Sequence, residues 1–286
     1  MSLFTRREVL IGSAALLSLP AFSEAALPEK NPYAPFRMGI QSYSLRNFKL
    51  EEALAKTQSL GLKFWEAYPG HIPVTNDPVK QAEIKVLLAK YDIELRTFGV
   101  VDFSKNETDA RAKFEFAKAM GIETLSAYPS LDSIDLLDRL TQEYKINIAI
   151  HNHGPGDNLY DKIAKGEKAM QGRNVRFGSC NDAGHYLRSG ENPVEAARVF
   201  GKRVHGVHLK DLKIEANGDQ HFTELGKGNL DLTGLLKLLK KNKFRGILSM
   251  EYEEHPENPI PYIEECLATV REIGRASCRE RVCSTV

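Results

Sequence analysis

The sequence predicts a single-domain α/β protein built as a (β/α)8 TIM barrel. Three observations lead to this prediction. Short β-rich segments recur along the chain from Arg37 to Glu253, and amphipathic segments of helical character alternate with them. The repeat occupies residues 31–272, which is close to the roughly 250 residues typical of this fold.

Eight segments are expected to form the strands, because each is a short apolar run rich in β-branched or aromatic residues. In chain order they are RMGIQSY (37–43), LKFWEAY (62–68), IELRTFGV (93–100), IETLSAY (122–128), INIAIHNH (146–153), VRFGSCND (175–182), RVHGVHLKD (203–211) and GILSMEYE (246–253).

Helices are expected between these strands, at 50–61, 77–91, 107–121 and 192–201. Gly61 and Gly121 close two of them, as glycine often does at a helix carboxyl end. A doubly wound open sheet is the alternative fold. It is disfavoured because the segment after the first strand, IQSYSLRNF (40–48), lacks a glycine-rich phosphate-binding turn.

Composition and charge bound the function. The chain of 286 residues is 42% hydrophobic and 27% charged, as in ordinary globular proteins. Its 39 Lys and Arg against 38 Asp and Glu give a net charge of +1, so there is no broad basic field for nucleic acid. No nucleic-acid partner is therefore expected.

Both ends of the chain are expected to lie outside the barrel domain. Residues 1–25 resemble a twin-arginine export signal, with Arg6 and Arg7 before an apolar run that is short for a membrane span. An exported, periplasmic protein without a stable membrane partner is expected. Residues 273–286 are expected to be a non-native tail, because 272–282 read as a translated sequencing adapter.

Polar residues gather where the expected strands end. In strand order they are Gln41; Glu66 and His71; His151 and His153; Asp182 and His185; His208, Lys210 and Asp211; Glu251 and Glu253. A strand-end carboxylate or imidazole needs a partner, water or metal, because unpaired burial is costly. The ends of the last four strands converge in a closed barrel.

One divalent metal is expected to bind at that point of convergence, with His151, Asp182, His208 and Glu251 as its ligands. Mixed imidazole and carboxylate ligation without thiolate favours Mn²⁺, with Zn²⁺, Co²⁺ and Fe²⁺ as alternatives.

The strand-end motifs HNHGP, NDAGHYLRSGENP, VHGVHLKD and MEYE resemble the xylose isomerase-like TIM barrel family, the sugar phosphate isomerase/epimerase group. The resemblance runs from Arg37 to about Arg271. It implies a metal held by carboxylates and a histidine at the last four strand ends, three of which correspond to Asp182, His208 and Glu251. His185 would then contact substrate or a second metal.

One departure from the family pattern concerns the fifth strand. Members that isomerise or epimerise ketoses commonly read Glu-Asn-His there, and this chain reads His151-Asn152-His153. An imidazole at position 151 can bind metal but cannot act as a carboxylate base. The hypothesis is therefore that His151 ligates the metal and His153 faces the substrate.

The resemblance implies a metal-dependent isomerase or epimerase that transfers protons through an enediolate of a free or keto sugar. Glu251 would be ligand and base, His153 or Glu66 the second acid–base group, and Lys210 would polarise the oxygen. The substrate-binding residues expected besides these are His185, Gln41, Tyr68 and Arg188.

Two other functions stay open. One is a metal-dependent eliminase or hydratase acting on 3-keto-glycosides or inosose. The other, of a different class, is a non-catalytic sugar-binding barrel whose metal site is degenerate. In each case the partner is a small carbohydrate, and a homo-oligomer is an open alternative to the monomer.

Overall fold

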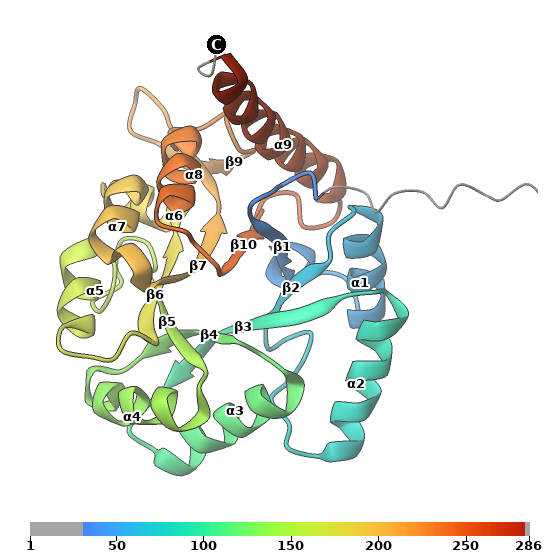
Figure 1. Ribbon diagram of the computed structural model, residues 1–286, viewed down its shortest axis with the longest axis vertical. Helices are drawn as coiled ribbons and strands as arrows, with labels where there is room; N and C mark the ends of the chain where they lie inside the picture. Colours follow the sequence, from blue (N-terminus) through green and yellow to red (C-terminus); the bar gives the residue numbers. More distant parts are fainter. Residues whose placement is uncertain (1–30, 284–286) are drawn as a thin grey trace, which may run out of the picture. The chain divides into compact units, whose positions relative to one another are not determined.

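The fold positions eight parallel strands as a closed barrel with helices around it (Figure 1). The computed structural model describes residues 31–283, including the side chains of residues 31–274. The barrel strands are β1 (Arg37–Gln41), β2 (Phe64–Ala67), β3 (Glu94–Phe103), β4 (Thr124–Pro129), β5 (Asn147–His151), β6 (Phe177–Asp182), β7 (Val204–Leu209) and β10 (Ile247–Met250). They pair in the order β1-β10-β7-β6-β5-β4-β3-β2.

Helices connect successive strands and cover the outside of the barrel (Figure 1). They are α1 (Leu50–Ser59), α2 (Pro78–Lys90), α3 (Glu107–Met120), α4 (Ile134–Tyr144), α5 (Ile163–Met170), α6 (Ala183–Arg188), α7 (Pro193–Phe200), α8 (Leu232–Lys241) and α9 (Ile260–Cys283). Asp77 and Asn106 accept backbone N–H bonds at the starts of α2 and α3, and Gly121 ends α3 in the left-handed conformation.

The predicted (β/α)8 barrel is confirmed, because every expected strand coincides with one barrel strand. The expected ranges named no helix at α4, α5, α6, α8 or α9, and they did not include a second, two-stranded sheet. An antiparallel hairpin of β8 (Asp211–Ile214) and β9 (Gln220–Thr223) lies between β7 and α8 in the chain.

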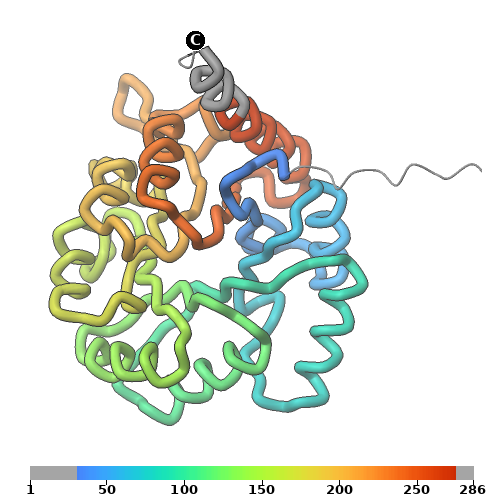
Figure 2. The backbone as a smooth tube through the Cα atoms, in the orientation of Figure 1, coloured from blue at the N-terminus to red at the C-terminus, as the bar shows by residue number. Residues whose placement is uncertain are grey.

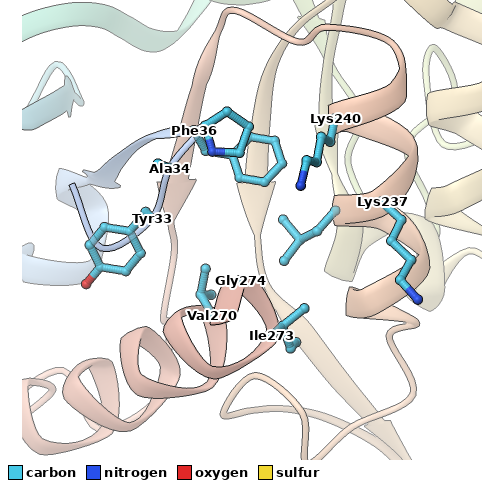
Figure 3. A pocket seen from close by; sticks show the side chains of 10 residues that line it. Tyr33, Ala34, Phe36, Lys237, Lys240, Val270, Ile273 and Gly274 are labelled. Atoms are coloured by element: carbon cyan, nitrogen blue, oxygen red, sulfur yellow. The ribbon is translucent and has the colours of Figure 1, made fainter. Parts of the chain in front are cut away.

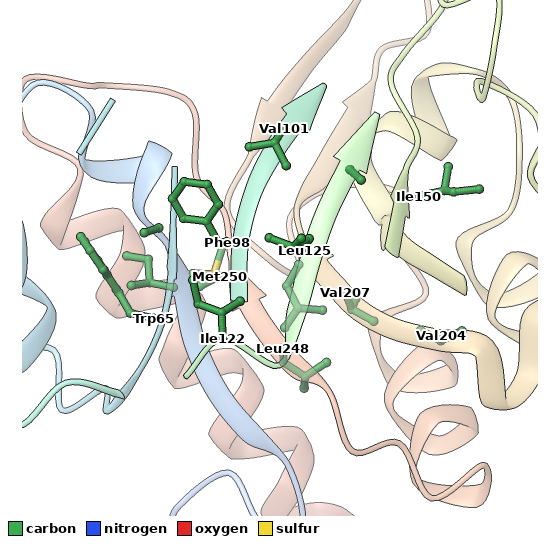
Figure 4. Packing of buried hydrophobic residues seen from close by; sticks show 14 of the residues in the cluster. Trp65, Phe98, Val101, Ile122, Leu125, Ile150, Val204, Val207, Leu248 and Met250 are labelled. Atoms are coloured by element: carbon green, nitrogen blue, oxygen red, sulfur yellow. The ribbon is translucent and has the colours of Figure 1, made fainter. Parts of the chain in front are cut away.

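Buried apolar side chains fill the space between strands and helices (Figure 4). Trp65, Phe98 and Leu125 come from β2, β3 and β4, and Val207 and Leu248 come from β7 and β10. Near-continuous apolar strands of this kind are typical of a parallel sheet that is covered on both faces.

The first and last parts of the barrel domain lie side by side (Figure 2). Arg271 on α9 donates a hydrogen bond of 3.0 Å to the Tyr33 hydroxyl, which precedes β1. The expected non-native tail begins within α9, which continues to Cys283. The expected export signal at 1–25 lies outside the described residues.

No helix in residues 31–283 is both long enough and apolar enough to cross a membrane.

Candidate metal centre

The pairing register of β5, β6, β7 and β10 places the carboxyl ends of these four strands at a similar height in the barrel. His151 pairs with Cys180, Asp182 pairs with His208, and His208 pairs with Ser249, just before Glu251. The four expected ligands are therefore brought together at the carboxyl end of the barrel. They are all buried, and their ligand atoms lie within 4.8 Å of one another.

The distances between these atoms are short. His208 Nδ1 lies 2.8 Å from Glu251 Oε2, 3.5 Å from Asp182 Oδ2 and 3.2 Å from His151 Nε2. His151 Nε2 lies 3.4 Å from Asp182 Oδ2. Two ligands that are each about 2.1 Å from one ion stand roughly 3.0–3.4 Å apart, so this arrangement fits a single divalent metal.

Hydrogen bonding within the cluster is incomplete, which also fits a metal. Asp182 Oδ2 and Glu251 Oε2 are buried without a hydrogen bond of acceptable geometry in the part of the chain that the structure describes. Buried carboxylate oxygens normally have partners. A cation among the four side chains would satisfy both oxygens, and the donor set of two imidazoles and two carboxylates suits a transition metal.

Asp182 is fixed by the local fold. Its Oδ1 accepts the N–H of His185 at 2.8 Å and so caps α6, while Oδ2 faces the cluster. The Asn152 side chain holds the end of β6 through two hydrogen bonds. It accepts one from the N–H of Asp182 and donates one to the Asp182 carbonyl, each at 2.9 Å. Asn152 was not among the expected site residues, although it lies between His151 and His153 in the sequence and its side chain positions the Asp182 backbone.

Glu66 lies beneath the cluster and does not line the cavity above it. It accepts hydrogen bonds from Ser126 on β4, at 2.6 Å, and Ser249 on β10, and its Oε1 lies 3.0 Å from His208 Nε2. Because these partners come from separate strands, Glu66 points into the barrel interior. This placement does not support the predicted acid–base role. It suits a carboxylate that orients His208, whose Nδ1 then faces the cluster.

The imidazolium form of His208 and the carboxylate form of Glu66 stabilise each other. Burial by itself disfavours the charged imidazole, but Cys180, Glu66 and Glu251 raise the pKa of His208 well above its ordinary value. Burial likewise disfavours the carboxylate, yet His208 and hydrogen bonds from the serines lower the pKa of Glu66. Without metal, a proton on His208 thus offsets part of the negative charge of the neighbouring carboxylates.

Lys210 is the buried cation of the site. Its Nζ lies 3.0 Å from both Asp182 Oδ2 and Glu251 Oε2, and 2.5 Å from Glu253 Oε1. Burial opposes the ammonium charge, but these three carboxylates raise the pKa of Lys210 well above its ordinary value. Burial would raise the pKa of Glu251, but Lys210 and His208 lower it to about 2.

His153 and His185 flank the cluster. The His153 ring lies 4.7 Å from the His151 ring, and burial lowers the pKa of His153 to about 4. Burial also lowers the pKa of His185 to about 3, so both rings are neutral near pH 7. His185 packs at 5.7 Å against Phe222 of the hairpin.

A cavity of about 350 Å³ opens above the cluster. It is lined by Gln41, Tyr43, Tyr68, Pro69, Gly99, Val100, His151, His153, His185, Lys210, Glu251 and Glu253. The expected site residues Gln41, Tyr68, His153, His185 and Lys210 therefore face one space. Gln41 is itself fixed by a hydrogen bond of 3.1 Å to the Gly99 carbonyl.

Arg188, an expected substrate-binding residue, does not line this cavity. Its guanidinium packs over Phe222 at 5.5 Å and lies 3.4 Å from His185 Nδ1. Glu253 does line the cavity and was not among the expected site residues, although its place two residues after Glu251 was a usable signal.

A second cavity of about 280 Å³ lies between the segment before β1, α8 and α9 (Figure 3). Among the residues whose side chains the structure describes, its charged lining residues are Lys237 and Lys240, and none of its lining residues is a histidine or a carboxylate. It therefore shares no ligand-type residue with the metal cluster.

The fold and this cluster define a (β/α)8 barrel with a candidate metal site beneath a cavity at the carboxyl ends of its strands. The model of the family described as xylose isomerase-like TIM barrel matches residues 54–273. The chain belongs to that family.

Curated relatives include inosose dehydratases and a rhizopine catabolism protein. An inosose dehydratase from Clostridium botulinum (strain Eklund 17B / Type B) is 23% identical over 280 residues, spanning 82% of this chain and 89% of that protein. The rhizopine catabolism protein MocC of Rhizobium meliloti is 28% identical over 141 residues, which span 44% of this chain and 42% of MocC.

Solved structures support the same fold. An uncharacterised protein from Parabacteroides distasonis superposes with a TM-score of 0.65 at 28% identity, covering 83% of this chain and 98% of that one. A D-tagatose 3-epimerase-like protein superposes with a TM-score of 0.67 at 18% identity, covering 85% of this chain and all of that one (100%).

Proposed function

We propose that this protein is a divalent-metal-dependent enzyme that removes a proton from the carbon beside a carbonyl group of a carbohydrate. The observation that carries this proposal is the convergence of His151, Asp182, His208 and Glu251 beneath a cavity that Lys210 also lines. A divalent metal bound there would stabilise the negative charge that develops on the carbonyl oxygen.

Glu251 is the proposed base. Its carboxylate faces the cavity, and its pKa of about 2 keeps it ionised. Lys210 adds positive charge 3.0 Å from the same carboxylate and orients it. Gln41 and His153 line the same space and can hydrogen-bond the substrate hydroxyls.

The cavity lining combines aromatic and apolar side chains with polar and charged ones, which suits a sugar. Tyr43 and Tyr68, whose rings lie 5.5 Å apart, line it together with Pro69 and Val100. Aromatic faces pack well against the C–H face of a sugar ring, while the polar side chains can bind its hydroxyl groups.

We favour β-elimination over epimerisation as the reaction. Epimerisation with two bases needs a base on each face of the carbon, and here both cavity carboxylates, Glu251 and Glu253, follow β10. The fifth strand supplies imidazoles instead of a carboxylate. The similarity to inosose dehydratase supports a keto-inositol or keto-sugar that loses water or an alcohol.

Aldose–ketose isomerisation is the second candidate, because it also needs a base on only one face. The proton that Glu251 removes from one carbon would return to the neighbouring carbon. Lys210 and the metal would stabilise the charge on oxygen in either reaction.

An NMR time course in D₂O tests the proposal, with Mn²⁺-loaded protein and a panel of inosose, 3-keto-glucosides and free ketoses. Deuterium should enter the carbon beside the carbonyl. Loss of the substituent would establish elimination, and formation of the isomeric sugar would establish isomerisation. Glu251→Gln at saturating Mn²⁺ should abolish both. A Mn²⁺-loaded protein that binds a panel member without any exchange would instead be a sugar-binding barrel.

A further inference from the structure

The Lys and Arg side chains in and beside the cavity already contact other groups of the protein. Lys210 is the only Lys or Arg among the described residues that line the cavity, and its ammonium lies within 3.0 Å of carboxylate oxygens of Asp182, Glu251 and Glu253. An anionic group of a ligand would have to displace one of these carboxylates to reach the ammonium.

Two arginines adjoin the cavity without lining it. Arg46 donates to the backbone carbonyls of Tyr43 and Glu253, at 3.2 and 2.6 Å, and stacks over the Tyr43 ring. Arg188 packs over Phe222. Neither guanidinium faces the space in which a substrate would lie.

The charge count of the centre opposes anions even with metal bound. Asp182, Glu251, Glu253 and Glu66 are carboxylates, whereas Lys210 is the one ammonium. With the histidines neutral and a divalent ion in place, these five side chains and the ion leave one net negative charge. A phosphate or carboxylate group on a substrate that approached Glu253, the carboxylate at the edge of this group, would be repelled by its negative charge.

Glu253 is the carboxylate best placed to accept hydrogen bonds from substrate hydroxyl groups. It lines the cavity with its side chain 24% exposed, and Oε1 is held by Lys210. Oε2 has no hydrogen bond within the described residues, so it can accept one from an incoming hydroxyl.

We propose that Glu253 is a specificity-determining residue that selects uncharged polyhydroxylated substrates and rejects phosphorylated or carboxylated ones. This inference rests on the proposed function for the carbonyl chemistry and adds the charge class of the substrate. Glu253 acts by binding a hydroxyl group and by holding Lys210 away from competing anions.

The test compares two unreactive probes, sorbitol and sorbitol 6-phosphate, by titration calorimetry on the Mn²⁺-loaded protein. The wild-type protein should bind sorbitol more tightly than its phosphate. Glu253→Gln keeps the shape of the side chain but removes its charge, so sorbitol binding should weaken and phosphate binding should strengthen. The selectivity ratio should fall by about tenfold or more, as expected for a lost charge-assisted hydrogen bond.

Glu254→Gln is the matched control, because Glu254 is the next residue and does not line the cavity. It should leave the ratio unchanged. A wild-type protein that prefers the phosphate, one that binds neither probe, or a Glu253→Gln variant with the wild-type ratio would overturn the inference.

The same samples separate this inference from the proposed function. Carbon-bound deuterium exchange without selectivity for the neutral probe would refute the role of Glu253 and leave the proposed function intact. Selectivity that depends on Glu253, without exchange on any carbonyl substrate, would refute the proposed function and leave the inference intact.

Discussion

At the scale of single residues, His151 and His153 occupy different parts of the site. They are two residues apart in the sequence, yet only His151 belongs to the four-residue cluster. His153 lines the cavity and contacts Tyr128 at 5.0 Å between ring centres. β5 ends at His151, so His153 lies in the following loop, where the two-residue period of a strand no longer fixes the direction of its side chain.

The His151→Ala variant should lose metal, and His153→Ala should keep it. Removing a ligand should weaken Mn²⁺ binding by more than the roughly 10- to 100-fold typical of losing a supporting residue. His153→Ala should retain Mn²⁺ and turn over poorly. Metal analysis and kinetics on both variants test the assignment, and it is wrong if both keep wild-type metal and activity.

The Glu66→Gln variant should bind Mn²⁺ about 10- to 100-fold more weakly, although all four ligands remain. The amide keeps the shape of the side chain but removes the charge beside His208 Nε2. Mn²⁺ titration measures the change. Glu123→Gln is the control, because Glu123 pairs with Arg37 at the amino end of the barrel. Equal affinity in Glu66→Gln and wild type would refute the orienting role.

At the scale of elements, the hairpin β8–β9 is anchored by one buried carboxylate. Asp211 Oδ1 accepts the N–H groups of Leu212 and Leu230, and Oδ2 accepts those of Gly226 and Gly228, at 2.8 to 3.1 Å. These bonds fold the segment from β7 to α8 back onto the barrel mouth. Phe222 on the hairpin then packs against His185 and Lys210.

The Asp211→Asn variant should lower the free energy of unfolding by about 3 kcal/mol, because the amide presents its own N–H groups to two backbone donors. Urea unfolding measures this change. Asp219→Asn in the exposed hairpin turn should change the free energy by less than about 0.5 kcal/mol. Similar stabilities for the two variants would show that Asp211 does not anchor the hairpin.

The hairpin was missed from the sequence, although a signal for it exists. Asn217-Gly218 lies at its turn, with Gly218 at a φ of 90°, and this pair is a common hairpin turn. The two strands beside this turn are short and partly exposed, and β9 carries the polar residues Gln220, His221 and Thr223. Apolar periodicity finds buried strands more readily than exposed ones.

At the scale of the whole molecule, the strand pattern and the convergence of strand ends could be predicted together. Parallel strands in a barrel must end on one face, so the positions of His151, Asp182, His208 and Glu251 followed from the fold. The direction of Glu66 could not be predicted. Whether a polar residue in a strand faces the interior or the mouth depends on barrel register, which one sequence does not contain.

The metal-free protein should lose stability on acidification partly through His205, near the amino end of β7. Burial lowers the pKa of His205 to about 4, despite a hydrogen bond to the Val175 carbonyl. The unfolded chain, with a pKa of about 6.5, therefore binds the extra proton first. The stabilising contribution is complete above pH 6.5 or so and is lost as the pH falls toward about 4.

Urea unfolding at pH 7 and pH 5 in the presence of a chelator tests this. The wild type should lose more free energy of unfolding between these pH values than His205→Gln does. His221→Gln, at an exposed position in the hairpin, should behave like wild type. An identical loss in His205→Gln and wild type would contradict the expectation.

The central claim is that one divalent metal binds among the four converging side chains. Anomalous X-ray diffraction from a crystal of the Mn²⁺-loaded protein tests it most directly. The account predicts one strong peak within about 2.0–2.3 Å of His151 Nε2, Asp182 Oδ2, His208 Nδ1 and Glu251 Oε2. No peak in this cluster, or a peak bound by other residues, would contradict it.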